Sequence, residues 1–171
     1  MAKINLKEVA TVGIVPKVTN LRVVLQATKV TIGESKSSGN RMATIELEIV
    51  GGQTELLDAN GLRVDVLGLK PTMFVVLEDD PRSLSSLREL LIKLDLPTEV
   101  DMANDQEIME LFGKIRFEAL ISSQQNKVTE WDTTQGKEVP AKDAEGRQLL
   151  GPCTWMPVNS RSILGAVAPV N

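Results

Sequence analysis

Residues 43–49 read Ala-Thr-Ile-Glu-Leu-Glu-Ile, a strict alternation of apolar and polar side chains. Because successive side chains of a strand point to opposite faces, this alternation predicts a strand with one buried and one exposed face. Residues 21–32 carry a second such pattern, but its apolar phase shifts after Ala27, so we expect a β-bulge near Thr28. The stretch 33–41 has turn composition, so the two strands are expected to form a hairpin with a long, flexible, basic loop.

Further strands and two helices are predicted after this hairpin. Asp80-Pro81 favours the start of a helix whose leucines recur at helical spacing and which ends before Pro97. A second, short helix is expected over residues 104–112. The later strands or hairpins are predicted over residues 62–66, 73–77, 115–121, 126–139 and 153–158, the last as a closing strand.

This order of elements is that of a small five-stranded Greek-key barrel of the OB type, with its helix between the third and fourth strands. Another α+β sheet covered on one face by one or two helices would show the same order. We therefore expect a mainly β fold with one or two helices, best described as an OB-like barrel. The predicted domain covers residues 20–160, with extended arms at 1–19 and 161–171.

Composition excludes several kinds of chemistry. The 171 residues include no His and one Cys, Cys153, which rules out Ser-His-Asp and Cys-His catalysis as well as His- or Cys-based zinc sites. The carboxylate cluster Glu78-Asp79-Asp80 directly precedes Pro81, so helix capping explains it better than a magnesium site. We expect no enzyme activity, no cofactor and no bound metal.

The same composition bears on location. No stretch reaches the roughly 18 apolar residues of a membrane span, and residues 1–12 lack a signal-peptide core. A lone cysteine cannot form an intrachain disulfide, so a reducing compartment is the default. These features predict a soluble cytoplasmic protein with no membrane contact.

Charge is unevenly distributed along the chain, although the net charge is only −4. Residues 1–41 carry seven basic and two acidic side chains, whereas residues 42–112 carry five basic and fifteen acidic ones. A basic segment next to an acidic one suggests two different surfaces. The basic hairpin would suit an anionic partner, and the acidic middle would face away from it.

The stretch Lys29-Val-Thr-Ile-Gly-Glu-Ser-Lys-Ser-Ser-Gly-Asn-Arg-Met42, with the alternating strand that follows, resembles the first hairpin of a family of phage-encoded OB-fold proteins. Members occur in replication and recombination modules and are regarded as single-stranded DNA-binding proteins or close relatives of them. The resemblance continues through the Leu-rich helix to Phe112-Gly-Lys-Ile-Arg-Phe-Glu-Ala119 and covers about residues 20–122. It implies an OB barrel, single-stranded DNA as ligand, and phage replication or recombination proteins as partners.

The candidate DNA-binding residues are cations along the hairpin and the fourth strand, with one aromatic side chain. Phe74, Phe112 and Phe117 lie in apolar phases and are expected in the core, and Trp155 is also favoured as a core residue. Trp131 has polar neighbours, so exposure and base stacking are as probable for it as packing under a loop. The predicted site comprises Lys17, Arg22, Lys29, Lys36, Arg41, Lys114, Arg116 and Trp131.

Two functional hypotheses follow. The first is a phage single-stranded DNA-binding protein without much sequence preference, which holds phosphates on a basic hairpin rim. The second is a structural or protein-interaction module of the same fold, such as a virion component, that forms a homo-oligomer. The low number of aromatic residues, five in the chain, and the absence of charged side chains over residues 163–171 favour the second hypothesis.

Overall fold

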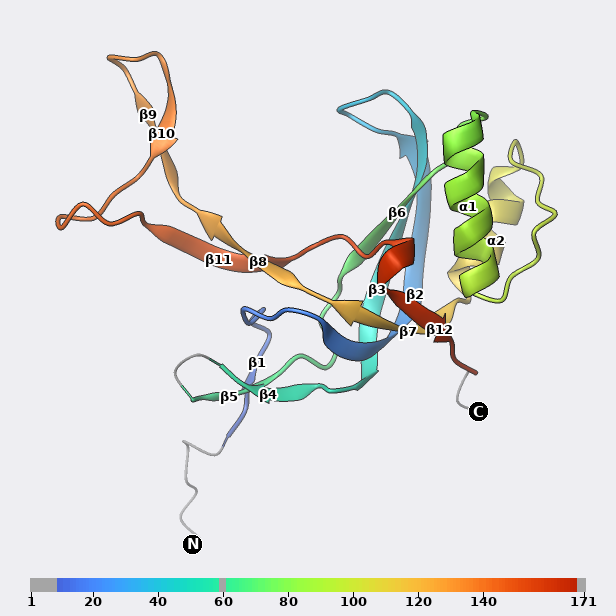
Figure 1. Ribbon diagram of the computed structural model, residues 1–171, viewed down its shortest axis with the longest axis horizontal. Coiled ribbons are helices and arrows are strands. Elements are labelled where there is room, and N and C mark those ends of the chain that lie inside the picture. The colour runs from blue at the N-terminus through green and yellow to red at the C-terminus, as the bar shows by residue number, and fades with distance from the viewer. Residues whose placement is uncertain (1–8, 59–60, 169–171) are drawn as a thin grey trace, which may run out of the picture.

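The computed structural model describes residues 9–58 and 61–168, and it shows a mainly β protein with a curled five-stranded antiparallel sheet at its centre (Figure 1). The strand order in this sheet is β12-β7-β2-β3-β6. The fold is compatible with an OB-like barrel. The strands of this sheet are β2 (Leu21–Glu34), β3 (Arg41–Gly52), β6 (Thr72–Val76), β7 (Arg116–Ile121) and β12 (Ile163–Ala166).

The predicted hairpin is confirmed, including its bulge. Ala27 pairs with Leu47 and Lys29 pairs with Glu46, which leaves Thr28 as the extra residue. The Thr28 hydroxyl donates to the carbonyl oxygen of Glu46 at 3.1 Å, so a side chain satisfies part of the interrupted ladder. The loop is shorter than expected, because β2 and β3 reach residues 34 and 41 and backbone hydrogen bonds between Ser35 and the far side of the turn close it.

Alternation along the strands places the core inside the curled sheet. Val23, Leu25, Ile45 and Leu47 are completely buried, whereas their neighbours in sequence are at least partly exposed. Phe112 and Phe117 are buried in the same core, as predicted. Burial of this kind contributes roughly 25 cal/mol per Å² of apolar surface and is the main source of stability.

Both predicted helices are present, one in contact with β6 and β12 and the other packed against β2. Helix α1 (Pro81–Lys93) begins after Asp80, whose carboxylate accepts hydrogen bonds from the backbone and hydroxyl groups of Ser83 at 2.9 and 2.7 Å. Helix α2 (Asp105–Gly113) is capped in the same way by Asn104. Hydrogen bonds to its ionised form hold the pKa of Asp80 below its ordinary value, which identifies this carboxylate as a cap.

The third strand of the central sheet is β6, which confirms residues 73–77 as a strand. The stretch predicted over 62–66 forms instead β5 (Arg63–Asp65), in a separate three-stranded sheet with β1 (Thr11–Val12) and β4 (Glu55–Leu57). The reason is local: hydrogen bonds join Asp58 to Leu62, so β5 pairs back onto β4.

The prediction of a closing strand over 153–158 was wrong. Residues 150–155 form β11, which pairs with β8 (Ser123–Lys127) in a two-stranded ribbon, and β9 (Thr129–Asp132) and β10 (Lys137–Pro140) form the hairpin at its far end (Figure 1). Pro157 offers no N–H for a ladder. The strand that pairs with the free edge of β7 is β12, which lies within the expected C-terminal arm.

The described parts of the two terminal segments are therefore paired with other strands and do not form extended arms. β1 pairs in parallel with β5, and β12 belongs to the central sheet, with a short 3₁₀ helix (Ser160–Ser162) before it. Of the expected N-terminal arm, residues 1–8 lie outside the described part of the chain.

Candidate nucleic-acid interface

The outward face of β2, β3 and β6 is a continuous surface set by strand register. Phe74 on β6 lies opposite Thr44 on β3, which lies opposite Thr31 on β2. Side chains that are directly opposite in an antiparallel pair share one face and contact each other. The neighbouring rows are Thr72, Glu46 and Lys29 on one side, and Val76, Met42 and Gly33 on the other.

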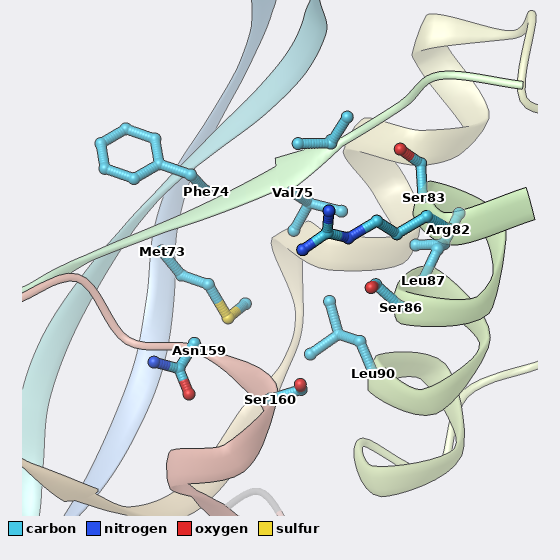
Figure 2. Close-up of a pocket in the computed structure, with 11 residues that line it drawn as sticks. Met73, Phe74, Val75, Arg82, Ser83, Ser86, Leu87, Leu90, Asn159 and Ser160 are labelled. Atoms are coloured by element: carbon cyan, nitrogen blue, oxygen red, sulfur yellow. The ribbon is translucent and has the colours of Figure 1, made fainter. Parts of the chain in front are cut away.

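Phe74 is the aromatic residue of this face, with 46% of its surface exposed, so its predicted place in the core was wrong. Its neighbours Met73 and Val75 take the buried positions of the strand. Figure 2 shows the Phe74 ring on the side of β6 away from α1. An exposed phenyl ring on a sheet is a platform on which a base can stack.

Two hollows meet at Phe74. One, of about 360 Å³, lies between β6 and β11 and is lined by Lys70, Phe74 and Trp155. The other, of about 330 Å³, lies between β6 and α1 and is lined by Phe74 and Arg82 among others (Figure 2). We call these two hollows, which share Phe74 as a lining residue, the β6 groove. Lys70 and Trp155 line the first hollow, and Arg82 lines the second.

The indole of Trp155 is only partly exposed and packs against the core, as favoured by the sequence. Its Nε1 atom is buried and has no hydrogen-bond partner in the structure. A buried indole N–H usually finds an acceptor, so this donor is an unsatisfied polar atom beneath the wall of the groove.

Acidic side chains also lie on this face. The carboxylate of Glu46 forms an ion pair with the ammonium group of Lys70 at 3.3 Å, and Lys29 on β2 lies opposite Glu46 on β3. No ion pair involves Lys29 within the described residues. The lysines therefore offset the carboxylate that would otherwise repel a phosphate here.

Two of the predicted site residues are held by other parts of the chain. The guanidinium of Arg41 binds the carbonyl oxygen of Met102 and the carboxylate of Asp105, at the start of α2. Arg22 pairs with Glu118 at 2.5 Å, and this hydrogen bond raises the pKa of the arginine. Both cations are thus engaged within the protein.

The remaining predicted residues do not gather at one place. Lys114 and Arg116 line a different hollow, beside residues 166–168, and the Nε atom of Arg116 is buried without a partner. Lys36 is exposed in the turn of the β2–β3 loop, and Lys17 is exposed before β2. Trp131 is 62% exposed, but it lies on the β9–β10 hairpin at the end of the ribbon (Figure 1).

Sequence reasoning missed the residues that define the β6 groove. Phe74 belongs to a continuous apolar run, which has no alternation to show which side chain faces outward. Lys70 and Arg82 are separated by this run and flank it only once β6 pairs with β3. The sequence carried no clear signal here, because the three carboxylates at residues 78–80 separate Phe74 from Arg82.

The comparisons leave the family open. The chain matches no protein-family model and no curated protein. In the described residues, no helix has the length and apolar character that crossing a membrane would need, and no three acidic or sulfur side chains gather as a metal site would require.

Proposed function

We propose that this chain is a single-stranded DNA-binding protein of the bacteriophage type, which binds largely without regard to sequence. The observation that carries the proposal is the β6 groove, in which an exposed Phe74 borders one hollow lined by Lys70 and another lined by Arg82. Aromatic platforms next to cations are the usual means of holding an unpaired strand, because every base has a face to stack and every nucleotide a phosphate.

The connectivity supports the finer assignment as an OB-like Greek-key barrel. β2 pairs with both β3 and β7, β3 pairs on with β6, and β7 pairs on with β12. The segment just before β12 approaches β6 in parallel, through one bridge between Met73 and Val158 and a 2.9 Å hydrogen bond from the Val158 N–H to the Thr72 carbonyl oxygen. A five-stranded barrel that is closed at one seam by a parallel contact, with helices between its third and fourth strands, is the OB arrangement.

The groove also lies where this fold type binds oligonucleotides. OB folds use the face of the second and third strands and the loops that flank it. Here those strands are β3 and β6. The flanking segments are the β2–β3 loop, which carries Lys36, and the β7–β12 connection, which contains the protruding ribbon (Figure 1).

In this mechanism Phe74 stacks on a base while the cations hold the backbone. Lys29 lies in the row next to the ring, and Lys70 forms an ion pair with Glu46 of that row. Lys36 is exposed in the β2–β3 loop. Binding is then sequestration, with no bond made or broken. Since phosphate contacts release counterions, the affinity should fall as salt rises.

The test is the fluorescence anisotropy of a labelled oligo-dT at low and high salt, with Phe74→Ala compared with the wild-type protein. Losing one stacked base should weaken binding by roughly five- to a hundredfold, equivalent to about 1–3 kcal/mol. Ile92→Ala is the matched control, because Ile92 is also an exposed apolar residue but lies on α1 outside the groove. Wild-type protein that fails to bind at low salt would overturn the proposal.

One observation favours the second candidate, a structural or protein-interaction module. Apolar side chains, including those of Trp131 and Leu150, are exposed along the ribbon, because two strands alone bury little apolar surface. A ribbon of this kind gains stability when another protein covers it. In that case the same anisotropy assay gives no change at any salt concentration, and light scattering reports an oligomer.

A further inference from the structure

The hollow between β6 and α1 has the shape of a small-molecule pocket rather than that of an open track. Its floor is apolar and consists of Met73, Val75, Leu87 and Leu90. These side chains come from a strand and a helix that face each other across the open side of the sheet (Figure 2). Its volume of about 330 Å³ is within the range of ligand sites, which begins at roughly 300 Å³.

The rim of this pocket is polar and mostly neutral. Ser86 and Asn159 stand at its edge, and neither the Ser86 hydroxyl nor the Asn159 amide nitrogen donates a hydrogen bond within the described residues (Figure 2). The Asn159 side-chain oxygen is engaged by the Arg161 N–H at 3.0 Å, which fixes the orientation of the amide. A hydroxyl and an amide held in place present a donor and an acceptor to a flat polar edge.

Arg82 supplies the third component. Its side chain extends from the first turn of α1 across the pocket toward β6 (Figure 2). It makes no ion pair within the part of the chain that the structure describes, although Asp80 is nearby in sequence. A guanidinium plane held over an apolar floor can cover an aromatic ring, through stacking and cation–π attraction.

From this arrangement we infer that the pocket takes one nucleobase, turned in from the strand that lies on Phe74. The inference rests on the proposed function, because Phe74 borders both the pocket and the rest of the β6 groove. The base packs on the leucines of α1, Arg82 covers it, and Ser86 and Asn159 meet its polar edge. The acidic stretch 78–80 at the start of α1 disfavours a phosphate there, so the sugar-phosphate chain stays on the Phe74 side.

The test fills the pocket from an exposed helix position. Ser86→Trp places an indole in the space meant for a base, while Ser85→Trp adds the same side chain to the next residue of α1, outside the pocket. Both positions are exposed, so both variants should fold, and urea unfolding checks this. The readouts are anisotropy of labelled oligo-dT and oligo-dA, and equilibrium dialysis of free thymidine and deoxyadenosine at millimolar concentration.

We expect Ser86→Trp to weaken binding of the oligonucleotides by roughly fivefold or more, and to abolish retention of the free nucleosides, while Ser85→Trp binds like the wild-type protein. Oligonucleotide affinity that is unchanged in Ser86→Trp would overturn the inference and leave the proposed function intact. Binding of free nucleosides would not change this conclusion if Ser86→Trp leaves the affinity for the oligonucleotides unchanged. Failure of the wild-type protein to bind any oligonucleotide would instead remove the proposed function itself.

Discussion

The central five-stranded sheet with its two helices, which we call the body, and the β8–β11 ribbon with its β9–β10 hairpin both contain antiparallel strands. Different interactions stabilise these two regions. In the body, β2 and β3 alternate buried residues with partly or fully exposed ones over most of their length, apart from the bulge at Thr28. In the ribbon, β8 reads Ser-Gln-Gln-Asn-Lys, and no residue of β8, β9, β10 or β11 is fully buried. The body is fixed by its core, whereas the ribbon is fixed by backbone pairing and side-chain hydrogen bonds such as that from Gln125 to the Gly151 carbonyl.

This difference shows that strand conformation and strand stability have separate causes. Pairing alone produces a regular ladder in the ribbon, as the register of β8 with β11 shows. Without an apolar face, however, such a ladder is only marginally stable in water. The body should therefore open as one unit, and the ribbon should open independently and far more often.

Hydrogen exchange offers the largest contrast. We expect amides at the centre of β2, such as that of Leu25, to exchange only by global unfolding, and those of Asn126 and Thr154 in the ribbon to exchange by local opening. If global unfolding costs about 5 kcal/mol or more, the rates should differ by at least roughly a thousandfold. Equal protection in the two regions, measured by NMR, would show that the ribbon belongs to the cooperative core.

Truncation of aromatic residues tests the same contrast by stability. Phe117→Ala should destabilise the body by about 3–5 kcal/mol, because Phe117 is completely buried in the core. Trp131→Ala should change stability by less than about 0.5 kcal/mol, since most of that indole is exposed. Urea unfolding followed by circular dichroism measures both values. A large loss in Trp131→Ala would reveal a packing role for the hairpin.

Neutralising a lysine in each region separates their roles in DNA binding. Lys29→Gln should reduce the slope of log affinity against log salt by about 1, because Lys29 lies in the row beside Phe74. Lys142→Gln removes an equal charge from the ribbon side of the molecule and should leave the slope nearly unchanged. If Lys142→Gln has the larger effect, the strand follows the ribbon and avoids the β6 groove.

The smallest expected effect is one of pH, and it is confined to the body. The pKa of Asp80 is lowered in the folded protein, so this cap stabilises the fold above the unfolded pKa of about 4 and loses its contribution as the pH falls through the folded value. Asp80→Asn keeps the capping oxygen but removes the charge. Its stability deficit at pH 7 should disappear near pH 2, while exchange of the ribbon amides stays the same in both proteins.

Sequence reasoning succeeded where a local pattern had one interpretation. The alternation at 43–49, the phase shift at Thr28 and the cap at Asp80 each depend on neighbours within a few residues, and all three are confirmed. The same holds for the helix after Asn104.

It failed where the outcome depended on distant partners. The segment that ends at Trp155 pairs with β8 and so forms one strand of the ribbon. Only tertiary contacts decide that β12, which is four residues long and contains a glycine, takes the place beside β7. The candidate site failed in a related way. The predicted cations were chosen for their charge, yet Arg41 is held by Asp105 and Arg22 by Glu118, across 64 and 96 positions of sequence.

The extra residue at position 28 decides which side of the sheet meets solvent over the second half of β2. Ahead of it the odd-numbered side chains of this strand are internal, and after it the even-numbered ones, Val30 and Ile32, turn inward. If the strand ran through Thr28 without a bulge, its alternation would turn Lys29 and Thr31 inside and Val30 and Ile32 outside. The chemical character of the outer surface next to Phe74 therefore depends on how the sheet accommodates this one extra residue.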